Sequence, residues 1–423
     1  MLRTVKVRLY PTTEQKQMLA KAFGSCRWLW NYYLDLTNKT YKETGKGLSR
    51  NQLQSLLPEL KKQEETEWLA ETYSQCLQVV ALNLSNAFIN FFERRTSYPR
   101  FKSKHGKQSL SYPQNVKIEG DCLKFPKLGL VYAKIHREIK GSIKTVTITK
   151  NPCNQYYASI LFEDGVEHPN TIPIWNTYLF DWAIKTQSYN FLSYAISKLP
   201  SQSIEGNVIG IDLGLTHFAI TSEGSKFDNP KWLAKHERNL KIKQQQLSRK
   251  QKGSNNRNKS RLKVAKVHNK ISRCREDFHH KLSRRIVNEN QVIVVENLAV
   301  RNMVRNHKLS KAINQVGWGQ FCTMLKYKSE NEGKVYLEVD RFFPSSKTCN
   351  NCLFQVSELP LDIRHWECPN CGAKHDRDIN AARNIKDEGL RILASGTGAT
   401  AYCPDVRPSS RGRKKSTVGQ SVG

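Results

Sequence analysis

The sequence predicts an α/β protein of two or three domains, with a segment of paired cysteines inserted into its last domain. Short β-branched runs at VIGID and VIVVE are typical of strands buried on both faces of a sheet. Apolar residues at helical spacing predict helices elsewhere in the 423 residues. Two C-x2-C pairs, separated by fifteen residues, interrupt the second half of the chain.

The first half has the pattern of a small β domain interrupted by helices. VKVRL alternates apolar and charged residues, and Thr12 with Gln15 forms a capping-box pattern that opens a helix. A second helix is expected from Glu67 to Arg95, where apolar residues recur at the spacing of a buried stripe. Strands are expected again between 98 and 163, because SIKTVTITK and YYASILFE alternate on either side of the turn residues NPCNQ.

The second half combines buried strands with polar segments. NVIGIDLGLTHFAITSEG is typical of a strand, a turn and another strand, and DINAARNIKDEGLRIL is typical of a helix. Residues 167–205 have apolar and aromatic residues at helical spacing, and no role is assigned to them. The tail, 394–423, is rich in Gly, Ser, Pro, Lys and Arg and is expected to be disordered.

The charge balance points to a polyanionic partner. Lys and Arg together number 68 against 37 Asp and Glu, which gives a formal net charge of +31. Nucleic acid is favoured over a membrane, because the chain has no run of about 18 apolar residues. The first residues lack the apolar core of a signal peptide, so a cytoplasmic, nucleoid-associated protein is expected.

Three carboxylates stand in unusual contexts. Asp212 lies in the apolar strand VIGID, Glu296 ends the strand VIVVE, and Asp378 opens the helix DINAARNI. A carboxylate on a buried strand is costly unless it is paired or holds a cation, and Mg²⁺ prefers carboxylate oxygens. Two such ions would support phosphodiester hydrolysis. Each carboxylate taken singly has another explanation: Asp378 as a helix N-cap, Glu296 as a hydrogen-bond partner of a loop, and Asp212 as a residue that orients a turn.

GIDLG also resembles the first phosphate loop of actin-like ATPases. That alternative would need further Gly-rich phosphate and adenosine loops downstream, and the sequence shows none that is convincing. The order Asp, Glu, Asp, with paired cysteines before the last Asp, favours a nuclease.

The paired cysteines have the spacing of a four-thiolate zinc ribbon. Each C-x2-C turn offers two thiolates, and two turns complete a tetrahedron with no open position, so one structural Zn²⁺ is expected. His365 and His375 lie nearby, but the four cysteines already fill the coordination shell. The expected ligands are Cys349, Cys352, Cys368 and Cys371.

A basic stretch from 234 to 285 contains eighteen Lys or Arg and three acidic residues. A solvated helical face is the ordinary explanation, but the one-sided charge favours contact with phosphates, which gives affinity without sequence information. The expected nucleic-acid-binding residues are Arg249, Lys250, Lys252, Arg257, Lys259 and Arg261.

Strings across the whole chain resemble the TnpB (OrfB) family, transposon-encoded nucleases related to the compact type V CRISPR effectors. They are VRLYPTTEQKQMLAKAFGSCRWLWN, NAFINFFERR, YPRFKSK, GIDLGLTHFAI, LSRKQKGSNNRNK, VIVVENLAV, FPSSKTCNNC and CPNCGAKHDRDINAARNI.

The resemblance implies an RNA-guided DNA endonuclease with a RuvC-like (RNase H) fold and an inserted zinc ribbon. Its catalytic, magnesium-binding carboxylates fall on Asp212, Glu296 and Asp378, the last chosen over Asp376 because it precedes x-N-A-A. A guide RNA from the transposon end and double-stranded target DNA beside a short motif are the implied partners. The implied segments are a β-barrel-like wedge domain at 1–35 (with the start of the helical region) and 98–166, a helical recognition insert at 36–97, the nuclease at 206–345 and 375–393, and the zinc ribbon at 346–374.

Two other functions stay open: an RNA-guided protein that binds DNA without cutting it, and a transposase or its accessory protein. The protein is expected to be a monomer or a homodimer on the RNA. One departure from the family pattern concerns the first cysteine pair, where Leu353 stands in the place of a common Gly.

Overall fold

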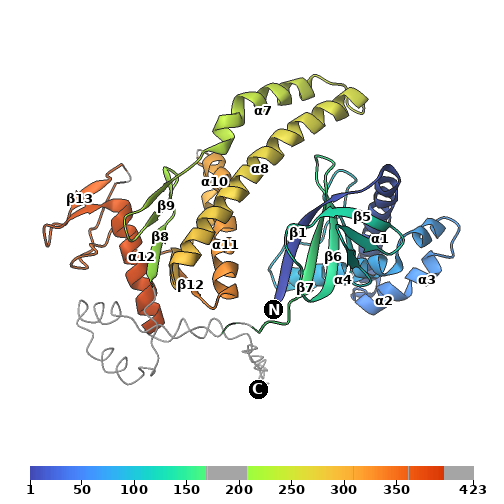
Figure 1. The fold of residues 1–423 in the computed structure, drawn as a ribbon, viewed down its shortest axis with the longest axis horizontal. Coiled ribbons are helices and arrows are strands. Elements are labelled where there is room, and N and C mark those ends of the chain that lie inside the picture. The colour runs from blue at the N-terminus through green and yellow to red at the C-terminus, as the bar shows by residue number, and fades with distance from the viewer. Residues whose placement is uncertain (168, 170–206, 308, 361, 395–423) are drawn as a thin grey trace, which may run out of the picture. The chain divides into compact units, whose positions relative to one another are not determined.

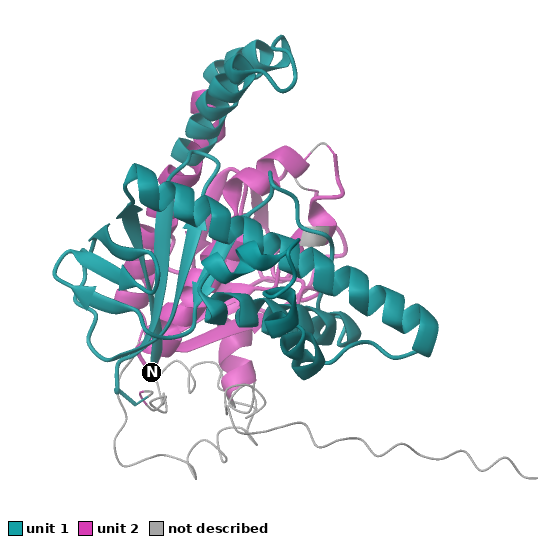
Figure 2. Cartoon of the chain, turned by 90° about the vertical axis from the view of Figure 1, so that its right-hand side faces the viewer, with its two compact units in different colours: residues 1–167, 238–270 teal, residues 168–237, 271–423 magenta. Residues whose placement is uncertain are grey.

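The computed structural model describes residues 1–167, 169, 207–307, 309–360 and 362–394. Nearly all of the predicted insertion at 167–205 and of the tail at 394–423 lies outside them. The chain divides into two compact units, which Figure 2 colours separately: unit 1 is residues 1–167 and 238–270, and unit 2 is residues 168–237 and 271–423.

Unit 1 is built on a seven-stranded sheet in which every neighbouring pair is antiparallel (Figure 1). Its strand order is β2-β6-β7-β1-β5-β4-β3. The predicted strands on either side of the NPCNQ turn are confirmed as β6 and β7. The strands are β1 (Leu2–Tyr10), β2 (Gln108–Tyr112), β3 (Lys117–Glu119), β4 (Cys122–Phe125), β5 (Gly129–Lys134), β6 (Ser142–Lys150) and β7 (Tyr156–Glu163).

Within residues 1–167 of unit 1, the helices lie between β1 and β2 in the chain. The predicted capping box is confirmed, because the Thr12 side chain accepts a hydrogen bond from the backbone of Gln15 and the Gln15 side chain accepts one from the backbone of Thr12. The described helices here are α1 (Thr13–Thr44), α2 (Arg50–Ser55), α3 (Leu57–Leu60), the 3₁₀ helix η1 (Glu67–Glu71) and α4 (Ser74–Phe92).

The prediction of one helix from Glu67 to Arg95 is wrong at its start. The chain is extended at Thr72 between η1 and α4, and the Thr72 hydroxyl donates to the Ser25 hydroxyl at 2.9 Å. This contact is made 47 residues away in the chain, so the local pattern of apolar residues could not reveal it.

Unit 2 contains a five-stranded sheet of order β10-β9-β8-β11-β12. Its centre is parallel, because β11 pairs in parallel with both β8 and β12, whereas β9 and β10 are antiparallel. The predicted burial of VIGID and VIVVE on both faces is confirmed. The strands are β8 (Val208–Asp212), β9 (His217–Thr221), β10 (Lys226–Asp228), β11 (Val292–Glu296) and β12 (Val335–Val339).

Helices cover both faces of this sheet. Ile385 and Leu390 of α12 (Arg377–Ala394) pack on one face with Val292 and Val294. On the other face Ile293 and Val295 pack against α8 (Asn255–Glu289) and α11 (Trp318–Asn331). The remaining elements are α7 (Trp232–Ser248), α9 (Val300–Met303), α10 (Ser310–Val316), β13 (His365–Glu367) and β14 (Lys374–Asp376).

No helix in the described ranges is both long and apolar enough to cross a membrane.

Candidate active site and metal centre

Two neighbouring strands place Asp212 and Glu296 at the same edge of the unit 2 sheet. Asp212 ends β8 and Glu296 ends β11. The parallel register pairs Ile211 with Val295, and each carboxylate is the next residue. The two strands are thus neighbours, which is the condition for their carboxylates to converge.

Helix α12 supplies the third carboxylate and lies unusually close to β8. A Cβ atom at Gly210 would lie 2.1 Å from the carbonyl oxygen of Ala382 and 2.6 Å from the backbone nitrogen of Lys386. Only a residue without a side chain permits this approach. The close packing holds the start of α12, and with it Asp378, at the end of the sheet where β8 carries Asp212.

The electrostatics of Asp212 include the charges of the other two carboxylates. Burial, followed by the charges of Glu296 and Asp378, raises the pKa of Asp212 to about 7, against opposing effects of the Leu213 backbone and Arg377. Burial also raises the pKa of Glu296. Crowded carboxylates with raised pKa values are the donor set that a divalent cation would neutralise.

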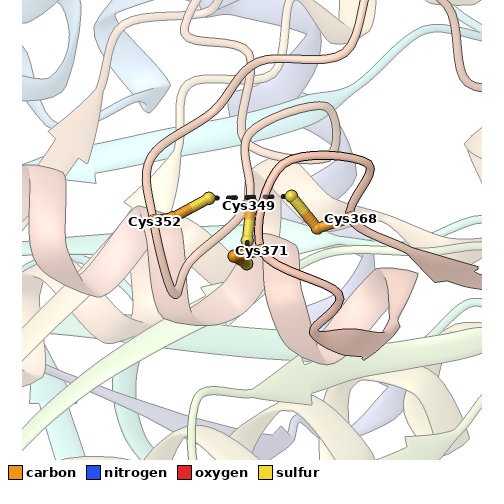
Figure 3. Close-up of side chains that lie close together, drawn as sticks. All are labelled: Cys349, Cys352, Cys368 and Cys371. Carbon is orange, nitrogen blue, oxygen red and sulfur yellow. Dashed lines mark hydrogen bonds between the residues drawn. The ribbon is translucent and has the colours of Figure 1, made fainter.

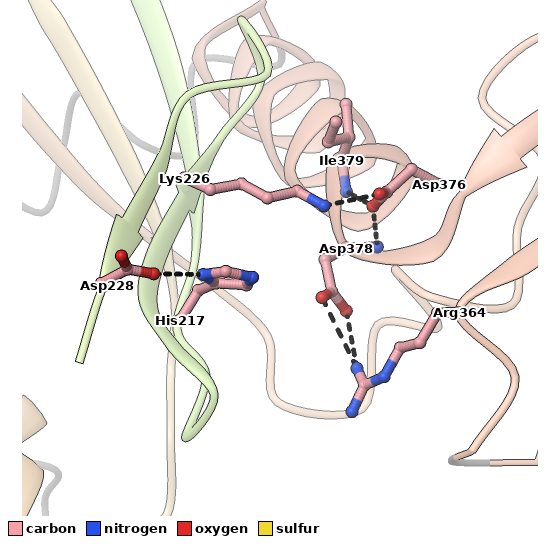
Figure 4. Close-up of polar contacts among 7 residues, drawn as sticks. All are labelled: His217, Lys226, Asp228, Arg364, Asp376, Asp378 and Ile379. Atoms are coloured by element: carbon pink, nitrogen blue, oxygen red, sulfur yellow. Dashed lines mark hydrogen bonds and ion pairs between the residues drawn. The ribbon is translucent and has the colours of Figure 1, made fainter.

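The two aspartates at the start of α12 have different partners (Figure 4). Asp376 is the N-cap, because its Oδ1 accepts hydrogen bonds from the backbone of Asp378 and of Ile379, both at 3.1 Å. Its Oδ2 pairs with the Lys226 ammonium at 2.6 Å. The interpretation of Asp378 as the N-cap is therefore wrong, and its carboxylate is available for another role.

Arg364 reaches Asp378 from the segment that precedes β13. Its Nη1 donates to Oδ1 and Oδ2 of Asp378 at 3.2 and 3.5 Å (Figure 4). The Asp378 side chain is 18% exposed, and that of Arg364 is 54% exposed. Sequence analysis missed Arg364, because no spacing rule distinguishes one arginine in a chain with 68 Lys and Arg.

The four predicted cysteines converge on one point (Figure 3). Their sulfur atoms all lie within 4.8 Å of one another, with Cys349 and Cys371 at 3.7 Å and Cys352 and Cys368 at 3.6 Å. Four thiolates bound to Zn²⁺ at about 2.3 Å would be about 3.8 Å apart. The donor set and its spacing therefore fit zinc.

Both cysteine turns have the same backbone form. The residue after the second cysteine, Leu353 or Gly372, donates its backbone N–H to the carbonyl of the first cysteine at 2.9 Å. Both residues adopt the left-handed backbone conformation, with φ of +63° at Leu353 and +69° at Gly372. A glycine adopts this conformation freely, whereas a leucine does so at a cost of about 1–2 kcal/mol.

We expect Leu353→Gly to stabilise unit 2 by up to about 1 kcal/mol, since relief of the left-handed strain exceeds the added freedom of the unfolded chain. Thermal unfolding in the presence of zinc measures the change. Gly372→Leu is the matched reverse substitution and should destabilise by a similar amount. A lower melting temperature for Leu353→Gly would show that the leucine side chain stabilises the turn by a contact of its own.

Buried asparagines connect the first cysteine turn to α12. Asn384 Nδ2 donates to the carbonyls of Ser345 and Thr348 at 2.7 and 2.6 Å, and its Oδ1 accepts from Asn350 at 3.1 Å. One turn earlier, Asn380 donates to Thr348 and accepts from the Asn350 backbone. The cysteine segment is thus fixed to the helix that carries Asp378.

Asn384→Ala should destabilise unit 2 by about 1–3 kcal/mol, because it removes a donor from the buried carbonyls of Ser345 and Thr348 and an acceptor from Asn350. Urea unfolding of the zinc-loaded protein measures the loss. Arg391→Ala is the control on the same helix, since its exposed pair with Glu388 contributes at most about 1 kcal/mol. Equal effects of the two substitutions would contradict a connecting role for Asn384.

Comparison with known proteins gives family matches over much of the chain. The OrfB_IS605 family, described as "Probable transposase", matches residues 191–307. The "Cas12f1-like, TNB domain" matches 318–385, and a "Helix-turn-helix domain" of OrfB_IS605 matches 1–46, where the structure has β1 followed by α1.

Two relatives align over nearly their whole length. A Streptomyces pristinaespiralis protein, named an RNA-guided DNA endonuclease, is 35% identical over 99% of this chain and 94% of its own length. The chain belongs to the TnpB (OrfB) family. InsQ of Escherichia coli K12, also named an RNA-guided DNA endonuclease, is 29% identical over 93% of this chain and 94% of its own length. The structure of the mini-RNA-guided endonuclease CRISPR-Cas_phi3 aligns over 93% of each chain with 11% identity and a TM-score of 0.41.

In this TnpB-family chain the predicted basic segment forms two helices, α7 and α8, joined by a short turn. Five of the six residues predicted to bind nucleic acid have exposed side chains: Arg249, Lys250, Lys252, Lys259 and Arg261. The sixth, Arg257, donates to the carbonyls of Leu247 and Lys250 at 3.1 and 2.7 Å. It therefore closes the end of α7 and has a structural role.

We expect Arg257→Ala to loosen the turn between α7 and α8, whereas Lys259→Ala should leave it unchanged. The reason is that the Arg257 side chain donates to the carbonyls of Leu247 and Lys250 at the end of α7, where a cation is also favoured by the helix dipole. Hydrogen exchange of the amides from 245 to 257 measures the opening. Equal protection in the two variants would contradict the structural role.

Proposed function

We propose that this chain is a guide-RNA-directed DNA endonuclease that cuts target DNA with a RuvC-like site formed by Asp212, Glu296 and Asp378. The main support is the convergence of three carboxylates from β8, β11 and α12: burial, followed by the charges of Glu296 and Asp378, raises the pKa of Asp212 to about 7. The relatives that align over nearly the whole chain are named RNA-guided DNA endonucleases.

We assign the unit 2 sheet with its helices to the RuvC-like nuclease, over 206–345 and 375–393, and the cysteine segment 346–374 to a zinc ribbon. A central parallel sheet covered by helices on both faces supports the first assignment. The antiparallel sheet of unit 1 would be the barrel-like wedge domain, over 1–35 and 98–166, with the recognition insert at 36–97.

Asp212, Glu296 and Asp378 would hold two magnesium ions, which when bound supply an activated water and stabilise the leaving oxygen of the phosphodiester. The chain's own residues arrange the site. Lys226 and the first backbone amides of α12 hold Asp376, and this cap fixes the turn that presents Asp378. Arg364 places a guanidinium beside Asp378, where it can pair with a phosphate oxygen of the DNA.

The partners of this activity would be a guide RNA from the transposon end and double-stranded DNA beside a short motif, with base pairing reading the target. The protein would act as a monomer or homodimer on the RNA. One Zn²⁺ on Cys349, Cys352, Cys368 and Cys371 would be structural, because four thiolates leave no open position.

The test is RNA-dependent cleavage. The protein is expressed with its flanking transposon-end DNA, the copurified RNA is sequenced, and a plasmid library matching that RNA is offered with and without magnesium. We expect a discrete RNA and cuts that require RNA and magnesium. Asp212→Ala should retain the RNA without cutting.

Other outcomes would identify a different function. A plasmid that is held but never cut by the wild type would indicate a guided binding protein, and strand-transfer products would indicate a transposase. Absence of a copurified RNA would contradict the RNA-guided activity itself.

A further inference from the structure

One face of the unit 1 sheet combines tyrosines with basic side chains. On β1, Lys6, Arg8 and Tyr10 alternate with the buried Val7 and Leu9, so they point away from the core. The antiparallel register places Lys134 opposite Arg8 and Tyr132 opposite Tyr10 on β5, and Tyr157 opposite Arg8 on β7. We call this set the tyrosine face: Lys6, Arg8, Tyr10, Tyr132, Lys134 and Tyr157.

The basic groups of the tyrosine face lie against its aromatic rings. The guanidinium of Arg8 is 5.3 Å from the ring centres of both Tyr10 and Tyr157, and the Lys6 ammonium is 5.1 Å from that of Tyr157. The rings of Tyr10 and Tyr132 are 5.6 Å apart. Cation and ring are thus held together before any ligand arrives.

These side chains retain capacity for a ligand. Arg8 donates from Nη1 to the Tyr157 hydroxyl at 3.3 Å, and the side chains of Lys6 and Lys134 are exposed. Tyr10 and Tyr132 are 48% and 50% exposed. Acidic residues near the margins are already paired, Glu163 with Lys144 and Glu119 with Lys124. The face therefore offers uncompensated positive charge beside exposed rings.

We propose that the tyrosine face binds an unpaired segment of nucleic acid, with bases stacked on Tyr10 and Tyr132 and phosphates against Arg8, Lys6 and Lys134. Nucleic acid offers both flat rings and anionic groups, which match the exposed tyrosine rings and the cations that lie beside them on this face. An unpaired strand is required because the faces of bases in a duplex are already stacked.

This inference shares with the proposed function only the premise that the protein binds nucleic acid. None of the three carboxylates lies in unit 1. Binding of unpaired strands is measured without divalent ions and without cleavage, so failure of the cleavage proposal and failure of this one are distinguishable.

The experiment measures binding of fluorescent oligouridine, oligothymidine and a short duplex to the full chain, without divalent ions. Tyr10→Ala with Tyr132→Ala should weaken binding of the unpaired probes by about 10- to 100-fold, because stacking of bases on both rings is lost. Duplex binding should stay within about twofold. Tyr10→Phe with Tyr132→Phe keeps the rings and should bind like the wild type. Lys140→Ala is a control outside the tyrosine face. It removes an exposed lysine that is paired with Glu138, and it should bind the unpaired probes like the wild type.

A second readout does not depend on the folding of a variant. Bromouridine in the RNA probe should photocrosslink to Tyr10 or Tyr132 of the wild-type chain, as identified by mass spectrometry. Stronger binding of oligouridine than of oligothymidine would identify the strand as RNA, and the reverse order would identify DNA. Unchanged affinity in the double alanine variant, equal losses on the duplex, or crosslinks confined to other regions would overturn the proposal.

Discussion

Asp212→Asn should abolish guided cleavage and, at the same time, make the metal-free protein more stable above pH 7. Cleavage should fall roughly a thousandfold or more, because the substitution removes a carboxylate from the centre of the proposed cation site. Stability should rise because the carboxylate of Asp212 is buried beside Glu296 and Asp378. The neutral amide removes both the burial penalty and the repulsion.

The pH dependence has a definite sign. The pKa of Asp212 is about 7 in the folded chain, against 3.8 as its ordinary value. The stability linked to this group is therefore fully present below about pH 4 and is lost as the pH rises to about 7. The advantage of Asp212→Asn should grow over that window, to the order of 1–3 kcal/mol, and then stay level.

Urea unfolding of the metal-free protein between pH 4 and pH 8 measures this advantage. Asp228→Asn is the control in the same sheet, because the Asp228 side chain is 89% exposed. Its stability should follow that of the wild type within about 1 kcal/mol, the usual limit for an exposed pair. If the free energy of unfolding varied with pH in the same way for wild type and Asp212→Asn, the pKa of Asp212 would not be raised by burial and by Glu296 and Asp378.

Gly210→Ala should damage both the fold and the activity of unit 2. The new Cβ would lie 2.1 Å from the Ala382 carbonyl oxygen, which belongs to the backbone of α12 and cannot turn away. The helix must move outward, at a cost of about 1–3 kcal/mol or more. Because α12 carries Asp378, the same movement should reduce cleavage by about 100-fold, as a displacement of about 1 Å can do.

Thermal unfolding and guided cleavage, measured on the same preparation, test this prediction. Gly319→Ala on α11 is the matched control, because no atom lies within 4 Å of its added Cβ and alanine favours a helix. It should be neutral or slightly stabilising. A Gly210→Ala protein with wild-type stability and cleavage would contradict the close approach of α12 to β8.

The sequence predicted the elements of unit 2 well where a strong local pattern exists. VIGID and VIVVE are short and rich in β-branched residues, so both strands and their terminal carboxylates were predictable. The pairing of the two strands was not, because it depends on how α8 and the intervening elements pack. The same holds for Gly210, whose importance arises only from the path of α12.

Longer-range contacts explain what sequence analysis missed. Both Asp376 and Asp378 stand at the start of a helix, and only the hydrogen bonds of the folded chain show that Asp376 is the cap. The contact of Arg364 with Asp378 depends on the fold of the cysteine segment between β12 and β14. The break at Thr72 likewise depends on its partner Ser25 in α1.

The most direct test of the central claim, that three carboxylates form one RNA-directed cutting site, is cleavage with a rewritten guide. The guide segment of the copurified RNA is replaced, and the cut position is mapped for wild type, Glu296→Gln and Asp378→Asn at fixed magnesium. The cut of the wild type should move to the newly matched sequence, while both variants retain the RNA and lose cutting. A cut position that does not change with the guide, or cutting that persists in either variant, would contradict the claim.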